Sequence, residues 1–258
     1  MNTNKNILIS AIVVAKNEEI KIEECLKSLS FADEIVLVDN GSKDKTNEIA
    51  RRNKAKIIQC LSGSWSEWRN SGADSSAGEW LLYIDADERV TQKLQEEIKR
   101  VIKESDTKSL YAIPRRNIIL GKEMVHGGWW PDYVKRLIKK KDLQGWKGDL
   151  HEEPVLRGEM GYLVNYIIHL KHDNLSEMVS KTNIWSNIEA KLLFDAHHPK
   201  MVWWRFLRPM FTELWSRLIA KMGVLDAQEG VIYSIYQMWS RFITYAKLWE
   251  KQKNYIKY

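Results

Sequence analysis

The chain has 258 residues, 44% of them hydrophobic and 29% charged, which fits a globular protein with one large domain or one domain and an appendage. The net charge of +6 favours an anionic partner, and nucleotide phosphates, anionic lipid and nucleic acid all meet that condition. The two cysteines, Cys25 and Cys60, have no partner at metal-ligand spacing, which argues against a zinc site and a disulfide framework. Both are interpreted as buried thiols in a reducing compartment.

The apolar stretch at residues 7–15 follows Lys5 and has some features of a signal peptide. It is short, however, and the polar residues 16–19 follow it directly, so we interpret it as a core strand that leads into a helix. No apolar run approaches the roughly 18–20 residues that span a bilayer. We therefore expect a cytoplasmic protein without a transmembrane helix.

Strand and helix patterns alternate as far as residue 102. Such alternation predicts a parallel sheet with helices on both faces. Asn17 is expected to cap the first helix, and Asp39-Asn40-Gly41 is a strong turn signal after the second strand. The expected strands are 7–14, 34–38, 56–60 and 80–84, and the expected helices cover 20–29, 46–53, 66–76 and 94–102.

The pattern changes after residue 105. Short strand-like segments separated by Gly, Pro and charged turns predict an antiparallel extension with long loops. From residue 176 to the end the pattern is helical, and three helices are expected, with breaks near residues 197–199 and 223–230. We therefore divide the chain into residues 1–175 and a helical region, residues 176–258.

Three carboxylates, Asp85, Asp87 and Glu88, follow the end of an apolar strand. Residues i and i+2 of a strand point to the same side, so Asp85 and Asp87 are expected to face one way. Neighbouring carboxylates repel each other unless a cation joins them, and Mg²⁺ or Mn²⁺ would leave positions open for phosphate oxygens. A metal site at this strand end is one interpretation, and a solvated acidic turn that caps the next helix is the other.

Two weaker signals lie at the end of the second strand and in the helix before the acidic strand. Asp39 ends the second strand, where a carboxylate can accept hydrogen bonds from a nucleobase N–H or a ribose hydroxyl, although Asp-Asn-Gly is also a generic turn. Arg69 and Asn70 lie early in the helix before the acidic strand. They would either meet diphosphate oxygens or base edges, or lie on a solvated helix face.

Residues 148–154, Gly-Asp-Leu-His-Glu-Glu-Pro, concentrate proton-transfer groups in a segment that otherwise has the character of a loop. A carboxylate with a modestly raised pKa would suit a general base, and Glu152 and Asp149 are the candidates. The alternative is a surface turn. A zinc site is not expected there, because no second His or Cys pair stands at metal-ligand spacing. His169 and His172 end a later strand, where either could line the cleft, and we favour a structural role for each.

The C-terminal region is rich in tryptophan, with half of the 12 tryptophans from Trp185 onward. Between residues 200 and 222 aromatic and aliphatic residues form a wide stripe, and five basic residues accompany one acidic residue, Glu213. Basic charge beside a Trp, Phe and Leu face is typical of a helix lying in a membrane interface. The alternatives are internal packing and an oligomer interface.

Three segments in this order, residues 10–19, 32–46 and 85–88, resemble the family 2 glycosyltransferases, which have the GT-A fold and act with inversion. Two departures from the pattern occur: Asn40-Gly41 stands where a small hydroxyl residue and a larger one are frequent, and Ala227 replaces a frequent glycine. Further motifs resemble the bacterial lipopolysaccharide-core branch, which includes inner-core β-glucosyltransferases, at residues 127–132, 136–137, 151–152, 223–226 and 245–250.

The resemblance implies an α/β fold: a GT-A (Rossmann-like nucleotide-diphospho-sugar transferase) sheet with a helical C-terminal extension. Residues 1–175 would be the catalytic domain, with a nucleotide-binding part at 1–105 and an acceptor-side part at 106–175. The nucleotide-sugar site would include Ala15, Asn17, Glu18, Asp39, Arg69, Asn70 and Asp85, and the metal site Asp87 with Asp85. The catalytic base would be Glu152 with Asp149 in reserve, and the acceptor side would include Trp129, Trp130 and His151.

The resemblance also implies the partners. The donor would be a UDP-sugar, carrying glucose or a similar hexose, and the cofactor Mg²⁺ or Mn²⁺. The acceptor would be a lipid A-core sugar, another membrane glycolipid or a capsule precursor, in lipopolysaccharide core or related surface-glycan synthesis. Such an enzyme would be cytoplasmic and peripheral on the inner face of the cytoplasmic membrane, with a homo-oligomer through the C-terminal helices as a further possibility.

Three other functions fit parts of the sequence. A nucleotidyltransferase also places acidic metal ligands on an α/β sheet, but residues 15–18 lack the glycine of a triphosphate-binding loop. A catalytically inactive homologue that binds membrane or partner proteins would not need Asp85, Asp87 and Glu152. Nucleic-acid binding is not expected, because the positive charges form no stripe and no known motif occurs.

Overall fold

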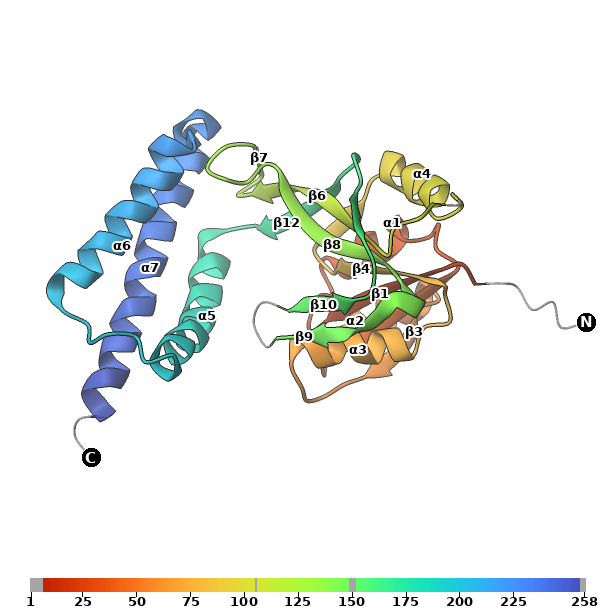
Figure 1. The fold of residues 1–258 in the computed structure, drawn as a ribbon, viewed down its shortest axis with the longest axis horizontal. Coiled ribbons are helices and arrows are strands. Elements are labelled where there is room, and N and C mark those ends of the chain that lie inside the picture. The colour runs from red at the N-terminus through yellow and green to blue at the C-terminus, as the bar shows by residue number, and fades with distance from the viewer. Residues whose placement is uncertain (1–6, 105, 149–151, 256–258) are drawn as a thin grey trace, which may run out of the picture. The chain divides into compact units, whose positions relative to one another are not determined.

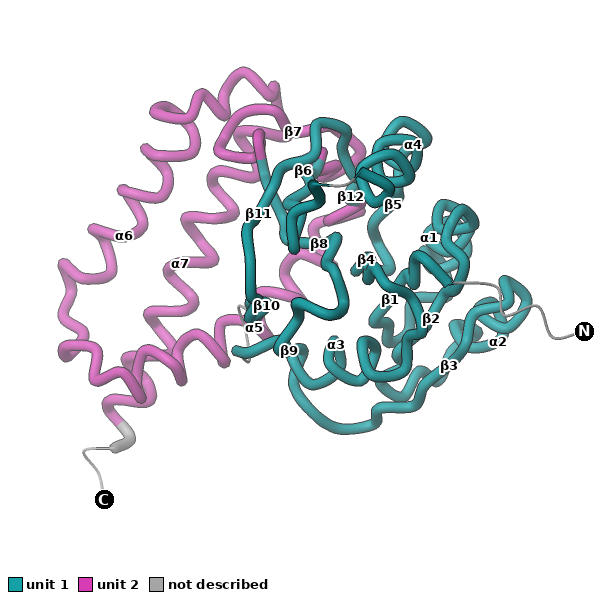
Figure 2. The backbone as a smooth tube through the Cα atoms, turned by 45° about the vertical axis from the view of Figure 1, so that its right-hand side comes forward, with its two compact units in different colours: residues 1–115, 132–169 teal, residues 116–131, 170–258 magenta. Residues whose placement is uncertain are grey.

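The computed structural model describes residues 7–104, 106–148 and 152–255. The chain forms two compact units, one of residues 1–115 and 132–169 and the other of residues 116–131 and 170–258 (Figure 2). Each unit has its own clusters of buried apolar side chains. The chain crosses between the units along β6 (Leu110–Ile119) and β12 (Ile167–His172).

Unit one follows the alternation that the sequence predicts, with each expected strand and helix present within a few residues (Figure 1). The strand β5 was not expected. The first part consists of β1 (Ile9–Ala15), α1 (Ile22–Ser28), β2 (Glu34–Asp39), α2 (Thr46–Arg52), β3 (Lys56–Gln59), α3 (Trp65–Asp74), β4 (Trp80–Asp85), β5 (Glu88–Val90) and α4 (Gln92–Val101). The rest comprises β8 (Asp132–Lys139), a 3-10 turn (Lys140–Asp142), β9 (Leu143–Lys147), β10 (Glu153–Leu156) and β11 (Met160–Tyr162).

The central sheet brings the ends of three parallel strands to one edge. Strands β3, β2, β1 and β4 lie side by side in this order and run parallel. Ala15 at the end of β1 pairs with Asp39 at the end of β2, and Val14 pairs with Asp85 at the end of β4. The sheet continues through β8, which is antiparallel to β4, and then through β6, β12 and β5. The carboxyl ends of parallel strands are the usual ligand-binding edge of an α/β sheet.

Strand β1 is buried along its whole length because helices cover both of its faces. Val13 belongs to one apolar cluster together with Cys25 and Leu26 of α1, whereas Ile12 belongs to a second cluster together with Ala73 of α3. The continuous apolar sequence of β1 thus reflects burial on two sides, as expected. Burial also raises the pKa of the Cys25 thiol, which agrees with its interpretation as an unreactive core residue.

Asn17 does not cap the first helix, and that prediction is wrong. Helix α1 begins at Ile22, and Asn17 lies in the preceding turn with a φ of 56°. Its backbone N–H donates to Ser42 Oγ at 2.9 Å, and its Oδ1 accepts from the N–H of Lys43 at 2.8 Å. The side chain therefore joins the loop after β1 to the loop after β2. A capping asparagine and a bridging asparagine look alike in sequence, because only the fold decides which backbone groups come within reach.

Unit two is built around three long helices, α5 (Leu175–Asp195), α6 (Trp203–Trp215) and α7 (Ala227–Tyr255). Helix α7 packs along both α5 and α6. The unit also contains β7 (Lys122–Met124), which forms a hairpin with β6, and a π-helical turn (Ser216–Ala220) and a 3-10 turn (Gly223–Asp226) that connect α6 to α7. Among the described residues, no helix combines the length and the apolar character that crossing a membrane requires.

The close contact of α3 with the sheet gives a test of this packing. A Cβ atom on Gly72 would lie 2.5 Å from Ile12 Cγ2 and 3.2 Å from Val38 Cγ2, and both neighbours are fully buried. We expect Gly72→Ala to lower the free energy of unfolding by about 1–3 kcal/mol, because these branched side chains have no room to move. Urea denaturation measures the change. Asp74→Ala, at an exposed position of the same helix, is the control, and equal losses in the two variants would contradict the packing.

Candidate active site

The acidic segment lies where β4 ends. Asp85 is the last residue of β4, residues 86–87 form a turn, and Glu88 begins β5. The strand alternation that was expected to place Asp85 and Asp87 on one face therefore does not reach Asp87. Glu88 is fully buried, and its Oε2 accepts a hydrogen bond from the backbone N–H of Asp85 at 3.0 Å, which closes the turn.

Arg136 of β8 holds two of these carboxylates. Its buried guanidinium donates through Nη2 to Asp85 Oδ2 and, at 2.8 Å, to Glu88 Oε1. Burial alone would raise the pKa of Asp85, but the charges of Arg136 and Arg69 outweigh burial and hold this pKa far below its usual range. Asp85 is therefore ionised throughout the physiological pH range. In the sequence, a metal was one way to offset the repulsion between these carboxylates. For Asp85 and Glu88, guanidinium groups offset this repulsion.

Arg115 of β6 adds a second guanidinium to Glu88. Its Nη1 lies 3.2 Å from Glu88 Oε1, and its Nε donates to Asp132 Oδ2 at 3.0 Å. Glu88 thus lies between Arg115 and Arg136, which come from neighbouring antiparallel strands. A fully buried carboxylate is tolerated only with such partners.

Arg69 of α3 joins the acidic strand end to the predicted catalytic base. Its Nε donates to Glu152 Oε1 at 3.0 Å, and its Nη2 donates to Asp85 Oδ1 at 3.2 Å. The guanidinium carbon lies 4.8 Å from the centroid of the Trp146 ring. Arg69 is buried and so does not lie on a solvated helix face, which was one of the two interpretations of its sequence position. The structure brings together three residues that are far apart in the sequence.

Asn70 holds the segment that carries Glu152 beside α3. Its Oδ1 accepts from the backbone N–H of Trp146 at 2.7 Å, and its Nδ2 donates to the carbonyl oxygen of Trp146 at 3.2 Å. This pair of hydrogen bonds ties α3 to β9, and β9 pairs antiparallel with β10, which begins at Glu153. The side-chain amide of Asn70 therefore anchors the small sheet whose edge carries Glu152.

His169, for which the sequence favours a structural role, lies beside Asp87. His169 Nε2 lies 3.5 Å from Asp87 Oδ2, because β12 pairs with β5 and places His169 opposite Glu88. An imidazole nitrogen and a carboxylate oxygen are ligand types that Mn²⁺ accepts, so the pair fits a divalent metal. Among the described residues no group of three His, Cys, Asp or Glu could hold a metal, so other ligands such as phosphate oxygens and water would have to complete the coordination shell.

Asp39 lies buried at the end of β2, where two loops meet. Its Oδ1 accepts from the backbone N–H of Ser42 at 3.1 Å, and its Oδ2 accepts from Asn47 Nδ2 at 3.0 Å. Burial alone would raise the pKa of Asp39, but these hydrogen bonds lower it, so the side chain is a carboxylate. Beside it, the buried Oδ1 of Asn40 has no hydrogen-bond partner among the described residues. A donor group of a ligand would satisfy this oxygen.

The loop that carries Ala15, Asn17 and Glu18 is held against the loop after β2. The N–H of Asn40 donates to the carbonyl oxygen of Ala15 at 3.0 Å, and the N–H of Glu18 donates to Thr46 Oγ1 at 2.8 Å. The predicted floor of the nucleotide site and the predicted base-binding residue Asp39 are therefore adjacent.

The predicted acceptor-side residues lie elsewhere in the chain. Trp129 and Trp130 belong to unit two, where the Arg116 guanidinium lies 5.6 Å from the Trp130 ring centroid and the Lys171 amine 5.3 Å from that of Trp129. The candidates Asp149 and His151 fall outside the described residues.

Asp226 holds the loop that precedes these tryptophans. Its buried carboxylate accepts from the backbone N–H of His126 at 2.8 Å and lies 2.9 Å from the same residue's Nδ1. The motif at residues 223–226 therefore has a structural role within unit two.

Residues 10–153 match the family model described as Glycosyl transferase family 2. The chain is a family 2 glycosyltransferase. With the sheet order given above, this confirms the expected α/β GT-A fold with its C-terminal helices.

Several known proteins are similar to this glycosyltransferase. An uncharacterized glycosyltransferase of Rickettsia typhi is 27% identical over 96% of this chain and 90% of its own length. The lipopolysaccharide core biosynthesis glycosyltransferase LpsC of Rhizobium meliloti is 25% identical over 94% of this chain and 92% of its own length. The crystal structure of S. aureus TarS 1–349 in complex with UDP-GlcNAc has 15% identity and a TM-score of 0.49 over 96% of this chain and 92% of that one. The match to a longer TarS chain spans 40% of its length.

The role of Arg136 can be tested through pH. Arg136→Leu leaves Asp85 and the buried Glu88 short of positive charge, and we expect a loss of about 3 kcal/mol or more in the free energy of unfolding at pH 7. Without Arg136 the pKa of Asp85 rises, so the folded variant takes up a proton at a higher pH than the folded wild type does, and this uptake offsets part of the loss as the pH falls. The loss should therefore be smaller at pH 5 than at pH 8.

Urea denaturation at both pH values measures this dependence. Lys135→Leu, which removes a more exposed ion pair from the same strand, is the control and should cost less than about 1 kcal/mol at either pH. A loss for Arg136→Leu that is independent of pH would contradict the electrostatic role of Arg136.

Proposed function

We propose that this family 2 glycosyltransferase moves glucose or a similar hexose, with inversion, from a UDP-sugar to a membrane glycolipid in lipopolysaccharide core or related surface-glycan synthesis. The observation that carries the proposal is the meeting of Glu152, Arg69 and Asp85 at the carboxyl end of β4, next to Asp87 and His169. This arrangement supplies a general base and a metal-binding pair at the edge of the sheet where α/β proteins bind nucleotides.

Glu152 is the proposed base. Its side chain is 17% exposed, so an acceptor hydroxyl can reach it, and Arg69 contacts its Oε1. In an inverting transfer the acceptor oxygen attacks the anomeric carbon, the hydroxyl proton passes to the carboxylate, and the nucleoside diphosphate leaves with the bonding electron pair. Arg69 would orient Glu152 for this step. Asp149 remains the reserve candidate.

Asp87 and His169 are the residues that would hold Mg²⁺ or Mn²⁺. A bound cation would stabilise the charge that develops on the leaving diphosphate. Asp85 is also proposed to bind ribose or metal, and its depressed pKa keeps the carboxylate available as an acceptor. Asp39 and the buried Oδ1 of Asn40 would receive donor groups of the base or ribose, above the floor formed by Ala15, Asn17 and Glu18.

The relatives and unit two support the proposed acceptor and location. The likeness to LpsC, named for lipopolysaccharide core biosynthesis, covers almost the whole chain and supports a glycolipid acceptor. Trp130 is exposed and has the Arg116 guanidinium over its ring, an arrangement suited to stacking on a sugar that carries negative charge. The enzyme would then work as a peripheral protein on the inner face of the cytoplasmic membrane.

Thermal stability tests the donor and the metal. We expect UDP to raise the melting temperature of the wild type in the presence of Mn²⁺ and not in its absence, and GDP, CMP and dTDP to have little effect. A ligand at 100 times its dissociation constant stabilises the native state by about 2.7 kcal/mol. Asp87→Ala and His169→Ala should each remove the metal-dependent part.

Asp74→Ala is a control for these variants, because Asp74 is exposed at the end of α3 and is not a proposed ligand of metal or nucleotide. If no nucleotide stabilises the wild type with any metal, the transferase proposal fails, and a catalytically inactive, membrane-binding homologue becomes the better account.

Glu152→Gln tests the base. The amide keeps the size of the side chain and an oxygen for Arg69 but cannot take a proton, so we expect sugar transfer to fall by about 10²–10⁴-fold. Stabilisation by UDP with Mn²⁺ should persist. Radiolabelled transfer from UDP-glucose to membrane lipid extract measures the activity.

Glu153→Gln is the matched control, because Glu153 is the next residue, is exposed and pairs with Lys135 on the surface. Nearly full activity of Glu152→Gln, or equal losses in both variants, would rule out Glu152 as the base.

A further inference from the structure

Helix α7 has two apolar sides. Ser234, Thr244 and Leu248 lie on the buried side, which packs against α5 and α6. On the other side an apolar stripe repeats at three- and four-residue intervals; four of its members are exposed, Ile235 to 48%, and Trp239 and Ala246 are half-buried. The stripe consists of Ile232, Ile235, Trp239, Phe242, Ala246 and Trp249.

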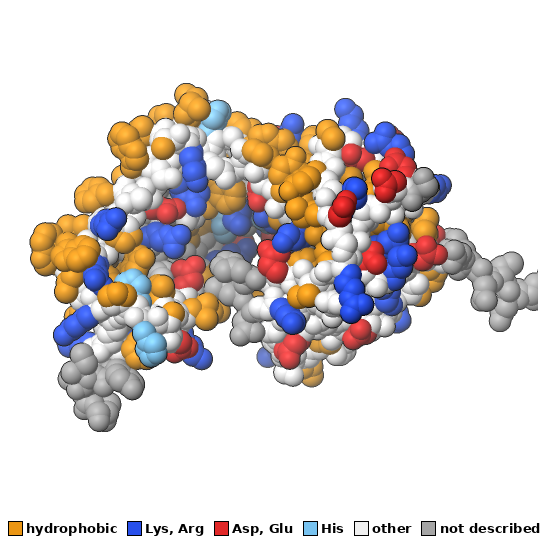
Figure 3. Space-filling view, viewed as in Figure 1, with side chains coloured by type: hydrophobic (Ala, Val, Ile, Leu, Met, Phe, Trp, Pro, Cys, Tyr) orange, Lys and Arg blue, Asp and Glu red, His pale blue; other side chains and the backbone are white. Residues whose placement is uncertain are grey.

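Helix α6 carries a second exposed stripe beside the first. It repeats every fourth residue, and Trp203 and Phe211 are 75% and 64% exposed. Phe206, the residue before Leu207, has its ring centroid 6.2 Å from that of Phe242 on α7, so the two helices are in contact next to both stripes. Figure 3 shows hydrophobic side chains gathered over α6, with Lys and Arg side chains among them. We call the following residues the apolar face: Trp203, Leu207, Phe211, Trp215 and the stripe of α7.

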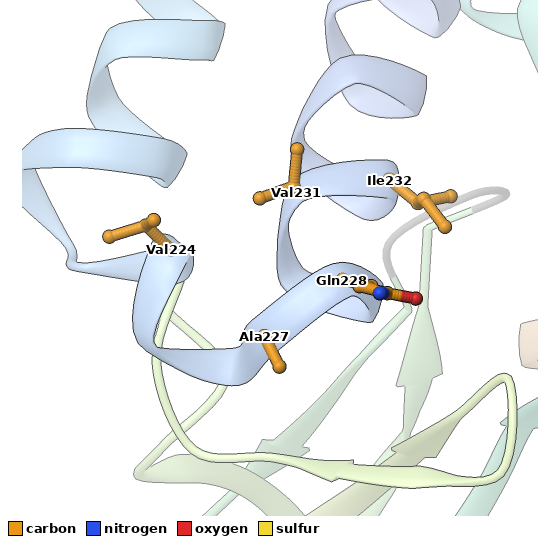
Figure 4. Close-up of a pocket in the computed structure, with 5 residues that line it drawn as sticks. All are labelled: Val224, Ala227, Gln228, Val231 and Ile232. Carbon is orange, nitrogen blue, oxygen red and sulfur yellow. The ribbon is translucent and has the colours of Figure 1, made fainter.

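The apolar face is hollowed along α7. One hollow of about 560 Å³ is lined by residues of the turn before α7 and of its first turns, and Gln228 is the polar member of its lining (Figure 4). A second hollow of about 390 Å³ lies between α7 and Val179 of α5. The two hollows share Ile232 in their linings and so lie next to each other along α7, and apolar residues line most of both.

Positive charge surrounds this face. Residues 200–253 contain nine basic and four acidic side chains, and one of the acidic ones, Asp226, is buried on His126. The exposed cations include Lys200 just before α6, Arg208 on α6 and Lys251 on α7. In a two-fold dimer the same surface would face itself, so these basic groups would meet basic groups of the second copy. An anionic lipid leaflet supplies the opposite charge instead.

We propose that the apolar face is a membrane-docking surface, on which α6 and α7 lie parallel to the plane of an anionic bilayer. The tryptophans would lie at the headgroup level, the aliphatic side chains and the hollows along α7 would receive acyl chains, and the basic side chains would contact lipid phosphates. The inference rests on the proposed function in one respect, because it names the surface through which the transferase reaches a membrane acceptor.

Vesicle binding of the full chain tests this surface without any donor or acceptor. Co-sedimentation would compare vesicles of phosphatidylcholine alone with vesicles that contain about a third phosphatidylglycerol. We expect at least tenfold tighter binding to the anionic vesicles, reduced by salt. The double variant Phe211→Gln with Ile235→Gln should lose at least tenfold of this affinity. Thr212→Gln, next to Phe211 on the polar side of α6, should bind like the wild type.

Two outcomes would overturn the proposal. Equal binding of the double variant and Thr212→Gln would show that lipid does not touch the apolar face. A wild-type dimer that the double variant converts to a monomer, without vesicle binding by either, would show that a second copy covers this face.

Melting with UDP and Mn²⁺ separates this inference from the proposed function. A double variant that still responds to UDP but does not bind vesicles supports the docking surface. A wild type that binds vesicles but does not respond to UDP supports the docking surface and rejects the donor assignment.

Discussion

The buried contact of Arg136 with Asp85 and Glu88 determines the geometry of the sheet edge that carries the candidate site. Glu88 closes the turn after β4 through the N–H of Asp85, and it can be buried there because two guanidinium groups neutralise it. The same turn leads into β5, whose pairing with β12 brings His169 next to Asp87. This charge network thus positions both Asp87 and His169, the pair proposed to bind a metal.

Arg69 connects this network to the opposite side of the site. One guanidinium contacts the carboxylate at the strand end and the carboxylate proposed as base, while Asn70 on the same helix anchors the sheet that carries the base. Neighbouring residues of α3 therefore set the distance between the two functional groups. Because Gly72 lets α3 lie directly on β1, this distance is tied to the core of unit one.

The sequence was sufficient for the features that depend on local patterns. The alternating strands and helices and the turn at Asp39 follow from apolar periodicity and turn chemistry. The roles of Arg69, Asp85 and Glu152 stay predictions, although the structure brings these three side chains into contact. The contacts of Arg115 and Arg136 with Glu88 could not be foreseen, because they join strands that meet only in the folded sheet. The contact of His169 with Asp87 could not be foreseen for the same reason, since the two residues are far apart in sequence.

The C-terminal helices show a different limit of sequence reasoning. The stripe of α6 stands out because its other side is basic, whereas α7 is apolar on two sides and its sequence does not tell which side is buried.

The arrangement of α7 between α5 and α6 also has a consequence for dynamics. The buried clusters of unit two have only three or four core members each, in contrast to the large clusters around β1. Amide hydrogens of these helices should therefore exchange with solvent faster than those of β1 when the protein is free in solution. A bilayer against the apolar face would slow this exchange, so the helices would reach their full order only at the surface where the acceptor resides.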